Sequence, residues 1–409
     1  MTGFLSHLRV IEGSAFVAAP FAGLTLAQAG AEVIRFDLPG GGLDYRRMPR
    51  DPASGRSFFW AGLNKGKKSI AIDFRKPEGA EIIQALVTAP GEGGGLLLTN
   101  FAGLPWLSHE RLTARRADVI ALEITGNFDG RSEVDYSVNA ALGLPAVTGT
   151  GGPDAPVNHV LPAWDLTCGL QAAFALLSAY VDRLRTGRGR QMSLALSDVA
   201  LAIVSHLGML GEADKGAMRR ASGNDIFGGF GRDFPTADGR RVMIVGLTLK
   251  QWRALQKATG LAPDIAALAS RLGADLDEEE TRYRHREAIA ALVGPWCASR
   301  TLAAIGEAFD AAGVCWGPYQ TFGQLLADDP RASDANPLWS TVEHPGLGPL
   351  RTPGSPIAVE GLARAPGGRA PELGEHTEEL LAGLLGLPGH AIAGLVDSGI
   401  VAPAPRRSE

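Results

Sequence analysis

Asp165 is the side chain whose sequence context best suits covalent chemistry. It ends the segment Asn158-His-Val-Leu-Pro-Ala-Trp-Asp165, at the predicted start of a long helix. Two interpretations stay open from the residues alone. Acids favour the first turn of a helix, which predicts an ionised carboxylate with a pKa at or below its usual value of about 3.9. A carboxylate can also be a covalent nucleophile toward an activated acyl group.

Other familiar catalytic patterns are weak in this sequence. Cys168 and His159 could form a thiol–imidazole pair, but a small buried thiol is the commoner role for such a cysteine. The sequence holds no HExxH, no close His/Asp cluster and no G-x-S-x-G elbow. We therefore expect no metal. The three cysteines form no CxxC and are odd in number, which predicts a reducing cytoplasmic location.

The densest basic cluster is Asn64-Lys-Gly-Lys-Lys68, directly before a predicted strand. It is either a solvated turn or a binding site for a compact polyanion such as a nucleotide phosphate. Arg46, Arg47 and Arg75 could add donors, since guanidinium groups are common phosphate partners. A second open case is the loop Ser222 to Gly231, which is either a turn or a mobile flap.

The elements that must position these residues predict an α/β fold. Residues 8–11 form a strand, Pro20 opens a helix that Gly30 closes, and residues 32–37 form a second strand. This is half of a doubly wound sheet. The first loop has a single glycine where G-x-G-x-x-G would be needed, which argues against a bound dinucleotide. Further strands are expected at 69–73, 95–99, 119–124 and 191–196, and helices at 77–87, 109–116 and 198–211.

A long helix is predicted from about Pro162 to Arg185, with Gly187 as its left-handed cap. Steps of three and four join its large apolar residues into one stripe. The members of this stripe are Leu166, Leu170, Phe174, Leu177, Val181 and Leu184. Beyond residue 242 a second pattern of strand, several helices and strand near Val314 predicts a smaller α+β domain. A last helix is expected at about 376–385.

Length and composition limit the class of protein. A chain of 409 residues with 45% hydrophobic content predicts two domains with substantial cores. The net charge of −5 argues against nucleic acid as a partner. No apolar run reaches the roughly 18 residues of a membrane span, so we expect a soluble protein with no membrane partner. The expected division is a large domain 1–200 completed by 335–409, a small domain 225–325, and linkers 201–224 and 326–334.

Several segments together resemble the class III CoA-transferase family, which includes formyl-CoA transferases, carnitine CoA-transferases and 2-methylacyl-CoA racemases. The opening strand, helix and strand with Leu26-Ala-Gln-Ala-Gly-Ala-Glu-Val-Ile-Arg35 is similar to that of the family. Asn64 to Asp73 resembles its "NKRS-x-x-x-D" strand, and Leu373-Gly-Glu-His-Thr-Glu-Glu-Leu380 resembles its C-terminal signature. The resemblance implies a Rossmann-like large domain with an inserted smaller α+β domain.

The resemblance also implies the site. Asp165 matches the family's nucleophilic aspartate, and His159 and the flap glycines Gly228 and Gly229 would lie at the substrate. The implied CoA contacts are Val17, Ala18, Ile72 to Arg75, Asn100, Phe101 and Tyr136. Leu38 replaces an expected arginine, and the segment after Phe101 lacks another. Phosphate contacts are therefore expected to shift toward Arg35, Arg46 or Lys67.

Further segments, among them Gly40 to Tyr45 and Phe230 to Phe234, resemble family members that move CoA between the two carboxyls of one dicarboxylic acid. The resemblance implies an interlocked homodimer and no cofactor beyond the CoA of the substrate. His159, Arg47 and Arg232 are candidates to hold the idle carboxylate.

Three alternatives remain. The first is CoA transfer between two acids by the same residues. The second is a racemase, although no histidine occurs between His109 and His159 to supply the second acid–base group. The third is a CoA-binding protein without activity.

Overall fold

The structure is a computed structural model that describes residues 3–101 and 103–404. The chain forms two compact units. Unit 1 comprises Met1–Leu142, His159–Gly216 and Pro330–Glu409, and unit 2 comprises Gly143–Asn158 and Ala217–Asp329. Segment 143–158, which was expected in the large domain, thus belongs to unit 2. Segment 201–216, which was expected to be part of a linker, belongs to unit 1.

Unit 1 is built on a seven-stranded sheet in the order β12-β3-β2-β1-β4-β5-β6. All neighbouring pairs are parallel except β12 with β3. The order of the six parallel strands is that of a Rossmann sheet, as predicted. The strands β1 to β5 are mostly buried, which suits strands covered on both faces, whereas the edge strand β6 is largely exposed. The strands are β1 (Arg9–Gly13), β2 (Glu32–Asp37), β3 (Lys68–Ile72), β4 (Leu96–Thr99), β5 (Ile120–Thr125), β6 (Arg190–Ala195) and β12 (Val401–Ala402).

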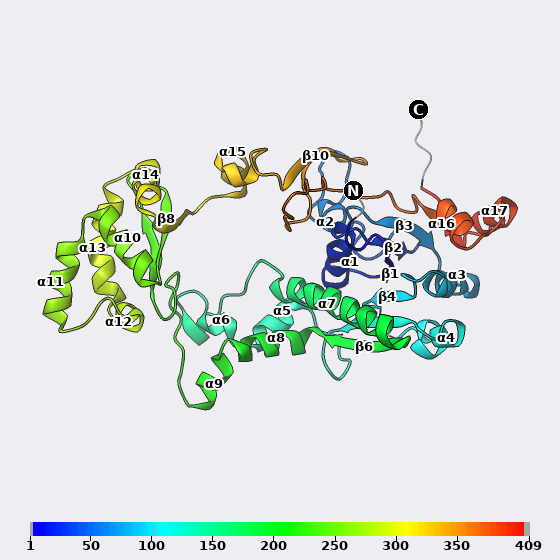
Figure 1. Ribbon diagram of the computed structural model, residues 1–409, viewed down its shortest axis with the longest axis horizontal. Helices are drawn as coiled ribbons and strands as arrows, with labels where there is room; N and C mark the ends of the chain where they lie inside the picture. Colours follow the sequence, from blue (N-terminus) through cyan, green and yellow to red (C-terminus); the bar gives the residue numbers. More distant parts are fainter. Residues whose placement is uncertain (1–2, 102, 405–409) are drawn as a thin grey trace. The chain divides into compact units, whose positions relative to one another are not determined.

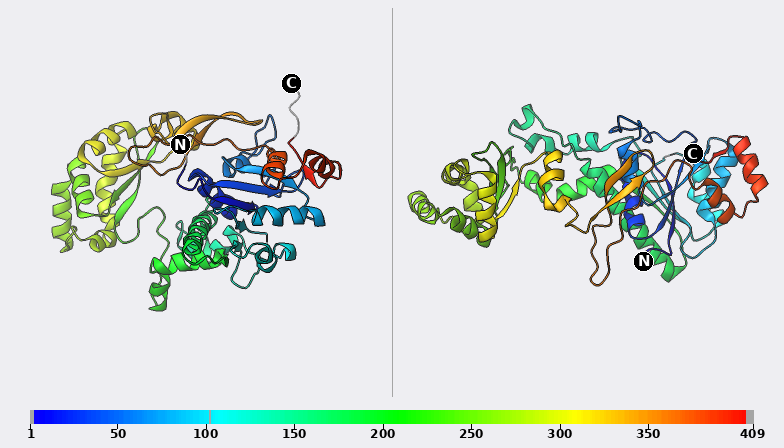
Figure 2. Two further views of the ribbon diagram at one scale, coloured as in Figure 1. Left: turned by 45° about the vertical axis from the view of Figure 1, so that its right-hand side comes forward. Right: turned by 90° about the horizontal axis from the view of Figure 1, so that it is seen from above.

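Helices cover both faces of this sheet (Figures 1 and 2). The helices α1 (Ala18–Gln28) and α7 (Ala163–Thr186) pack against each other on one face. On the other face, α3 (Pro77–Thr88) packs on α4 (His109–Arg115). The remaining elements of unit 1 are α2 (Phe58–Leu63), η1 (Pro105–Leu107), α5 (Asp135–Ala141), α8 (Leu196–His206), α9 (Met209–Asp214), η3 (Pro330–Ala332), β10 (Trp339–His344), β11 (Gly348–Pro353), α16 (Thr377–Gly383) and α17 (Gly389–Asp397).

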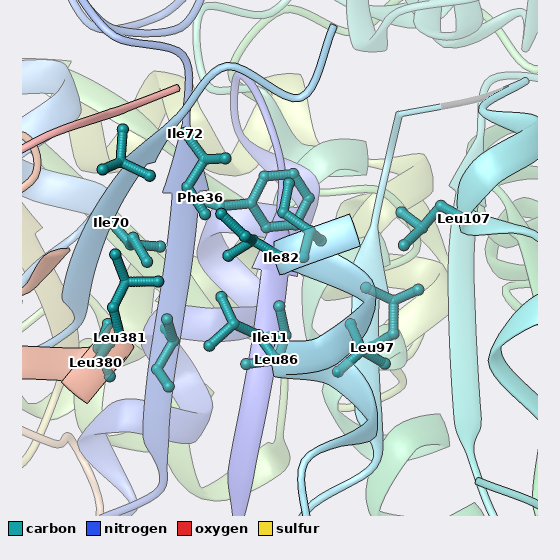
Figure 3. Packing of buried hydrophobic residues seen from close by; sticks show 14 of the residues in the cluster. Ile11, Phe36, Ile70, Ile72, Ile82, Leu86, Leu97, Leu107, Leu380 and Leu381 are labelled. Atoms are coloured by element: carbon teal, nitrogen blue, oxygen red, sulfur yellow. The ribbon is translucent and has the colours of Figure 1, made fainter. Parts of the chain in front are cut away.

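One hydrophobic core of unit 1 lies between the sheet and α3 (Figure 3). Ile11, Phe36 and Ile72 from three neighbouring strands meet Ile82 and Leu86 of α3, and all five are buried. The C-terminal helix α16 adds Leu380 and Leu381 to the same cluster. The end of the chain therefore packs into the same unit as its beginning.

The apolar stripe of α7 lies mostly at the surface of unit 1. Leu170, Phe174, Val181 and Leu184 are all more than half exposed. The buried face of the helix carries small residues instead, including Cys168, Gly169, Ala172 and Ala173. Small side chains let α7 approach α1 closely, so the larger apolar ones are left on the opposite face.

The C-terminal segment contains more structure than its Pro/Gly-rich composition predicted. The hairpin β10–β11, the helix α17 and the edge strand β12 were not predicted. The edge strand is only two residues long, and local composition carries no signal for so short an element.

Unit 2 is an α+β unit, as predicted. Its three-stranded antiparallel sheet has the order β7-β8-β9. Trp252, Phe230 and Phe309 are buried at the centre of its core. Its elements are α6 (Leu144–Val147), η2 (Gly152–Asp154), β7 (Phe230–Pro235), β8 (Arg241–Gly246), α10 (Leu249–Thr259), α11 (Ala262–Leu272), α12 (Glu279–Arg284), α13 (Arg286–Ala298), α14 (Leu302–Ala312), β9 (Cys315–Pro318) and α15 (Phe322–Asp328).

Within the described residues, no single helix is long and apolar enough to cross a membrane. One bent pair of helices, α13 with α14, meets the length and composition criteria together.

Candidate active site

Asp165 lies half-buried in the first turn of α7, close to the beginning of α1. One turn later, Gly169 faces α1 so closely that a Cβ atom there would lie 2.7 Å from the carbonyl oxygen of Ala18. This close approach is possible only because residue 169 has no side chain. It brings the start of α7 beside the loop that joins β1 to α1.

Asp135, from the first turn of α5, holds the start of α7 in place. Its Oδ2 accepts hydrogen bonds from the backbone amides of Trp164 at 2.7 Å and Asp165 at 3.1 Å. Its Oδ1 lies 2.6 Å from Nε2 of His159. Asp135 is buried and therefore caps α7 from 30 residues away along the chain. Sequence spacing alone does not show this contact, and the sequence analysis missed Asp135.

The carboxyl of Asp165 is poorly suited to carry a charge in this setting. Burial first, and then the negative charge of Asp135, raise the pKa of Asp165 to about 7. The positive charge of Arg47 acts in the opposite direction. The expectation of a pKa at or below 3.9 is wrong, because the amides at the helix start are taken by Asp135 and do not solvate Asp165.

Arg47 lies above two aromatic rings on this side of unit 1. Its guanidinium carbon is 5.4 Å from the centre of the Phe16 ring and 5.3 Å from that of Phe59. Phe16 itself adopts a φ of 65°, which is uncommon for a residue other than glycine. Of the three groups suggested to hold the idle carboxylate, Arg47 is thus the cation that acts on Asp165.

The β1–α1 loop is fixed from two sides. The Asn100 side chain accepts a hydrogen bond from the amide of Ala15 at 2.9 Å and donates one to its carbonyl at 2.8 Å. Asp44 accepts from the amide of Phe16 at 3.1 Å. These contacts determine the path of the chain into Val17 and Ala18, which are buried at the start of α1.

Cys168 is a structural thiol rather than a nucleophile. It is fully buried, and burial together with the nearby Asp165 raises its pKa to about 12. The thiolate is therefore not populated at neutral pH.

The remaining residues of the predicted CoA contacts have mixed exposure. Phe101, two residues after the end of β4, is half-buried, and the centre of its ring lies 6.0 Å from that of Phe74. Ile72 is fully buried in β3, where it is registered with Val401 of β12, and its carbonyl accepts from the amide of Phe74 at 3.0 Å. Arg75 is exposed and paired with Asp73 at 2.7 Å. Tyr136 is 42% exposed, and its hydroxyl donates to the carbonyl of Val160 at 3.4 Å.

Two of the three residues predicted to bind the phosphates are buried and form ion pairs with carboxylates of the protein. Arg35 is 1% exposed and pairs with Asp37 and Asp44 at 2.9 and 2.8 Å. Lys67 is buried with Glu12, 2.8 Å away. Neither can reach a phosphate, so for these two the expectation is wrong. Arg46, in contrast, is exposed.

The glycine loop belongs to unit 2. Gly228 has a φ of 84° and open space around it, while a Cβ on Gly229 would meet Leu247 at 2.7 Å. Gly231 lies within β7, paired with Val245, so the loop proper ends before Phe230. Arg232 pairs with Asp225 at 2.9 Å and Glu287 at 2.8 Å. These pairs take up its charge, which makes it a poor holder of a substrate carboxylate.

Among the residues that the structure describes, no group of three or more His, Cys, Asp or Glu side chains could hold a metal ion. The site is therefore one carboxyl of raised pKa, a buried carboxylate that positions it, and a nearby arginine.

Comparison with known proteins identifies the family. A profile of CoA-transferase family III matches residues 5–377. The 2-methylfumaryl-CoA isomerase of Chloroflexus aurantiacus is 51% identical over 407 residues, 99% of this chain and 100% of that protein. The succinyl-CoA:mesaconate CoA-transferase of Haloarcula hispanica is 30% identical over 402 residues, 93% and 96% of the two chains.

Among solved structures, a CAIB/BAIF family protein from Brucella suis superposes with a TM-score of 0.76 at 25% identity. The match covers 94% of this chain and 100% of that one. The fold and the full-length matches agree with the resemblance in the sequence. The chain belongs to CoA-transferase family III.

Proposed function

We propose that this protein moves CoA between the C1 and C4 carboxyls of 2-methylfumaryl-CoA, also called mesaconyl-CoA, by covalent catalysis at Asp165. The observation that carries the proposal is the Asp165 carboxyl, held by Asp135 at the start of α7 with a raised pKa. The full-length likeness to 2-methylfumaryl-CoA isomerase supports the substrate. A more basic carboxylate is a stronger nucleophile once ionised, so the raised pKa suits this role.

The first half-reaction transfers CoA to the enzyme. A carboxylate oxygen of Asp165 attacks the C1 thioester carbon, and the C–S bond breaks to release CoA thiolate and leave a mixed anhydride. The thiolate then attacks the aspartyl carbonyl carbon. This gives an aspartyl-CoA thioester and free mesaconate, whose C1 carboxylate now carries one oxygen of Asp165.

The second half-reaction returns CoA to the other end of the acid. After mesaconate turns, its C4 carboxylate attacks the aspartyl thioester and expels the thiolate, which forms the second anhydride. The thiolate attacks C4, giving the product and a free Asp165 carboxylate that retains one oxygen from C4. Each step exchanges one activated acyl group for another, so the reaction needs no metal and no ATP.

The other groups of the site have supporting roles in this scheme. Asp135 orients Asp165 through the backbone amides, and Arg47 favours its ionised form. Arg47 and His159 are the candidates to hold the idle carboxylate. The CoA moiety would contact Val17, Ala18, Asn100, Phe101 and the backbone around Ile72. The glycine loop at Gly228 and Gly229 would supply amide donors to the tetrahedral oxyanions.

Transfer of CoA between two separate acids is the second candidate. It is favoured by the 30% identity to the succinyl-CoA:mesaconate CoA-transferase of Haloarcula hispanica. Supplying labelled free mesaconate with unlabelled mesaconyl-CoA separates the two. We expect the isomer to form with little label in the thioester. Substantial incorporation of label would instead establish the intermolecular reaction.

We propose further that the protein is an interlocked homodimer. The four exposed apolar residues of α7 support an interface there, since monomers rarely expose such a contiguous stripe. Light scattering should give twice the chain mass, and Phe174→Glu should reduce it. The scarcity of cysteine supports a cytoplasmic location.

The direct test of the function is turnover by Asp165→Ala. This variant should lose isomerase activity while it still binds CoA, because only the nucleophile is removed. The matched control is Asp198→Asn, an exposed acid in the first turn of α8, which should stay active. Retained activity in Asp165→Ala would overturn the covalent scheme.

A further inference from the structure

Unit 1 contains a cavity whose lining includes Arg46, the exposed one of the three suggested phosphate ligands, and none of the catalytic or flap residues. Its volume is about 460 Å³, within the usual range for small-molecule sites. One wall comes from residues 45–61, which include α2, and the other from residues 344–371, around the β10–β11 turn (Figure 1). We call it the arginine cavity, and define it by its three cationic lining residues Arg46, Arg50 and Arg56.

The charge of this lining is one-sided. Within the described chain, no Asp or Glu lines the arginine cavity. Arg46 and Arg50 are exposed and form no salt bridge with any residue in the described ranges. Arg56 is the exception, since its Nη2 lies 3.7 Å from Glu372 Oε1, too far for a good hydrogen bond. His344 adds no charge, because its Nδ1 accepts a hydrogen bond from the amide of Ala370 and burial lowers its pKa.

The basic cluster of residues 64–68 adds one more cation to this region. Lys67 is taken by Glu12, and Lys68 by Glu32 and Glu379 at 2.7 Å each. Lys65 is the lysine of the cluster that has no such ion pair within the described residues. Burial lowers its pKa, and its charge lowers the pKa of His344, which lines the cavity. The positive charge of Lys65 thus acts at the cavity without a counter-ion.

The geometry also selects the kind of anion. Guanidinium groups offer forked donors that match phosphate and carboxylate oxygens. The rings of Tyr45 and Trp60, 5.0 Å apart, form an apolar wall beside these donors. Arg46 and Arg50 have no acidic partner among the described residues, which favours a doubly charged phosphate over a single carboxylate.

We propose that the arginine cavity binds a phosphate group, carried either by a free phosphate ester or by the CoA of the substrate. The neighbouring residue Arg47 acts on Asp165, so an anion at Arg46 would also steady the segment that carries Arg47. Binding of a phosphate group does not depend on the proposed isomerase activity, whereas the assignment of that phosphate to CoA rests on the proposed function.

The test is calorimetric titration of the full-length protein with inorganic phosphate, without turnover. The wild type should bind phosphate saturably, with one site per chain. Arg46→Gln/Arg50→Gln should weaken this binding about 10- to 100-fold, the usual effect of removing charged hydrogen-bond donors. Arg50→Gln alone should have a smaller effect. Arg271→Gln, an exposed arginine of α11 outside the lining, is the matched control and should bind like the wild type.

A second titration, in saturating CoA, distinguishes the two sources of phosphate. The 3′-phosphate of CoA occupies the cavity if two results are found together. CoA must abolish phosphate binding, and the double variant must bind CoA more weakly than the wild type while its affinity for dephospho-CoA is unchanged. If phosphate still binds, the ligand is a free ester. The proposal is overturned if the wild type shows no saturable binding, or if the double variant, folded by circular dichroism, binds phosphate as tightly as the wild type. A second copy of the chain covering the cavity would give that negative result.

Discussion

The Oδ2 of Asp135 accepts a hydrogen bond from the backbone amide of Asp165 at 3.1 Å. One carboxylate therefore both fixes the position of the other and opposes its ionisation. Amides that would otherwise stabilise a negative charge on Asp165 are engaged by Asp135. Burial first, and this contact second, raise the pKa of the carboxyl at the start of α7 to about 7.

The pH dependence of the reaction follows from this relationship. The nucleophile must be ionised, so kcat/KM should rise with pH and level off above about 7. In Asp135→Asn the like charge is absent, and the midpoint of this rise should move to lower pH. The measurement is the pH profile of kcat/KM for both proteins. An unchanged midpoint in a folded Asp135→Asn variant would show that Asp135 does not act on Asp165.

The contribution of Asp165 to folding stability should fall as pH rises, whereas kcat/KM should increase. A folded-state pKa above the unfolded value favours the folded state at acid pH, and this stability is lost as pH rises through about 7. Asp165→Asn has no charge to bury. Its melting temperature should exceed that of the wild type at pH 8 and approach it at pH 4. The corresponding difference in the free energy of unfolding at pH 8 should be a few kcal/mol at most. A variant that is less stable at pH 8 would contradict the raised pKa.

The buried pair of Lys67 and Glu12 should contribute strongly to the integrity of unit 1. Lys67→Met leaves the Glu12 carboxylate buried without its partner, which costs about 3–5 kcal/mol. Lys68→Met removes a partly exposed lysine with two surface partners and should cost about 1 kcal/mol or less. Urea unfolding of both variants gives the comparison. Similar losses in the two would show that burial does not distinguish these ion pairs.

The contact between α7 and α1 depends on Gly169. A Cβ there would lie 2.7 Å from the Ala18 carbonyl, so Gly169→Ala must push the two helices apart, at a cost of about 1–3 kcal/mol. Isomerase activity should fall with it, because Asp165 lies one turn away. Gly211→Ala, in α9 with open space around it, is the control and should be neutral or slightly stabilising. Equal stability and equal isomerase activity of the two variants would refute the close packing of α7 on α1.

Patterns within one element were predictable from the sequence, and contacts between distant elements were not. Most strands of the parallel sheet follow from apolar runs, and the end of α7 follows from Gly187, and both signals act locally. The caps formed by Asp135 and the burial of Arg35 and Lys67 depend on residues brought together by the fold. A basic residue looks the same in a sequence whether it faces a ligand or a buried acid. This is why Arg35 and Lys67 were wrongly predicted as phosphate ligands, while the role of Asp165 stays a prediction from its motif.

The central claim is that Asp165 exchanges an oxygen with the substrate in every turnover. The most direct test uses mesaconyl-CoA whose free C4 carboxylate carries ¹⁸O, followed by mass analysis of the peptide that contains Asp165. The account predicts that ¹⁸O appears on Asp165 after turnover in unlabelled water. A fully active enzyme whose Asp165 stays unlabelled would contradict it.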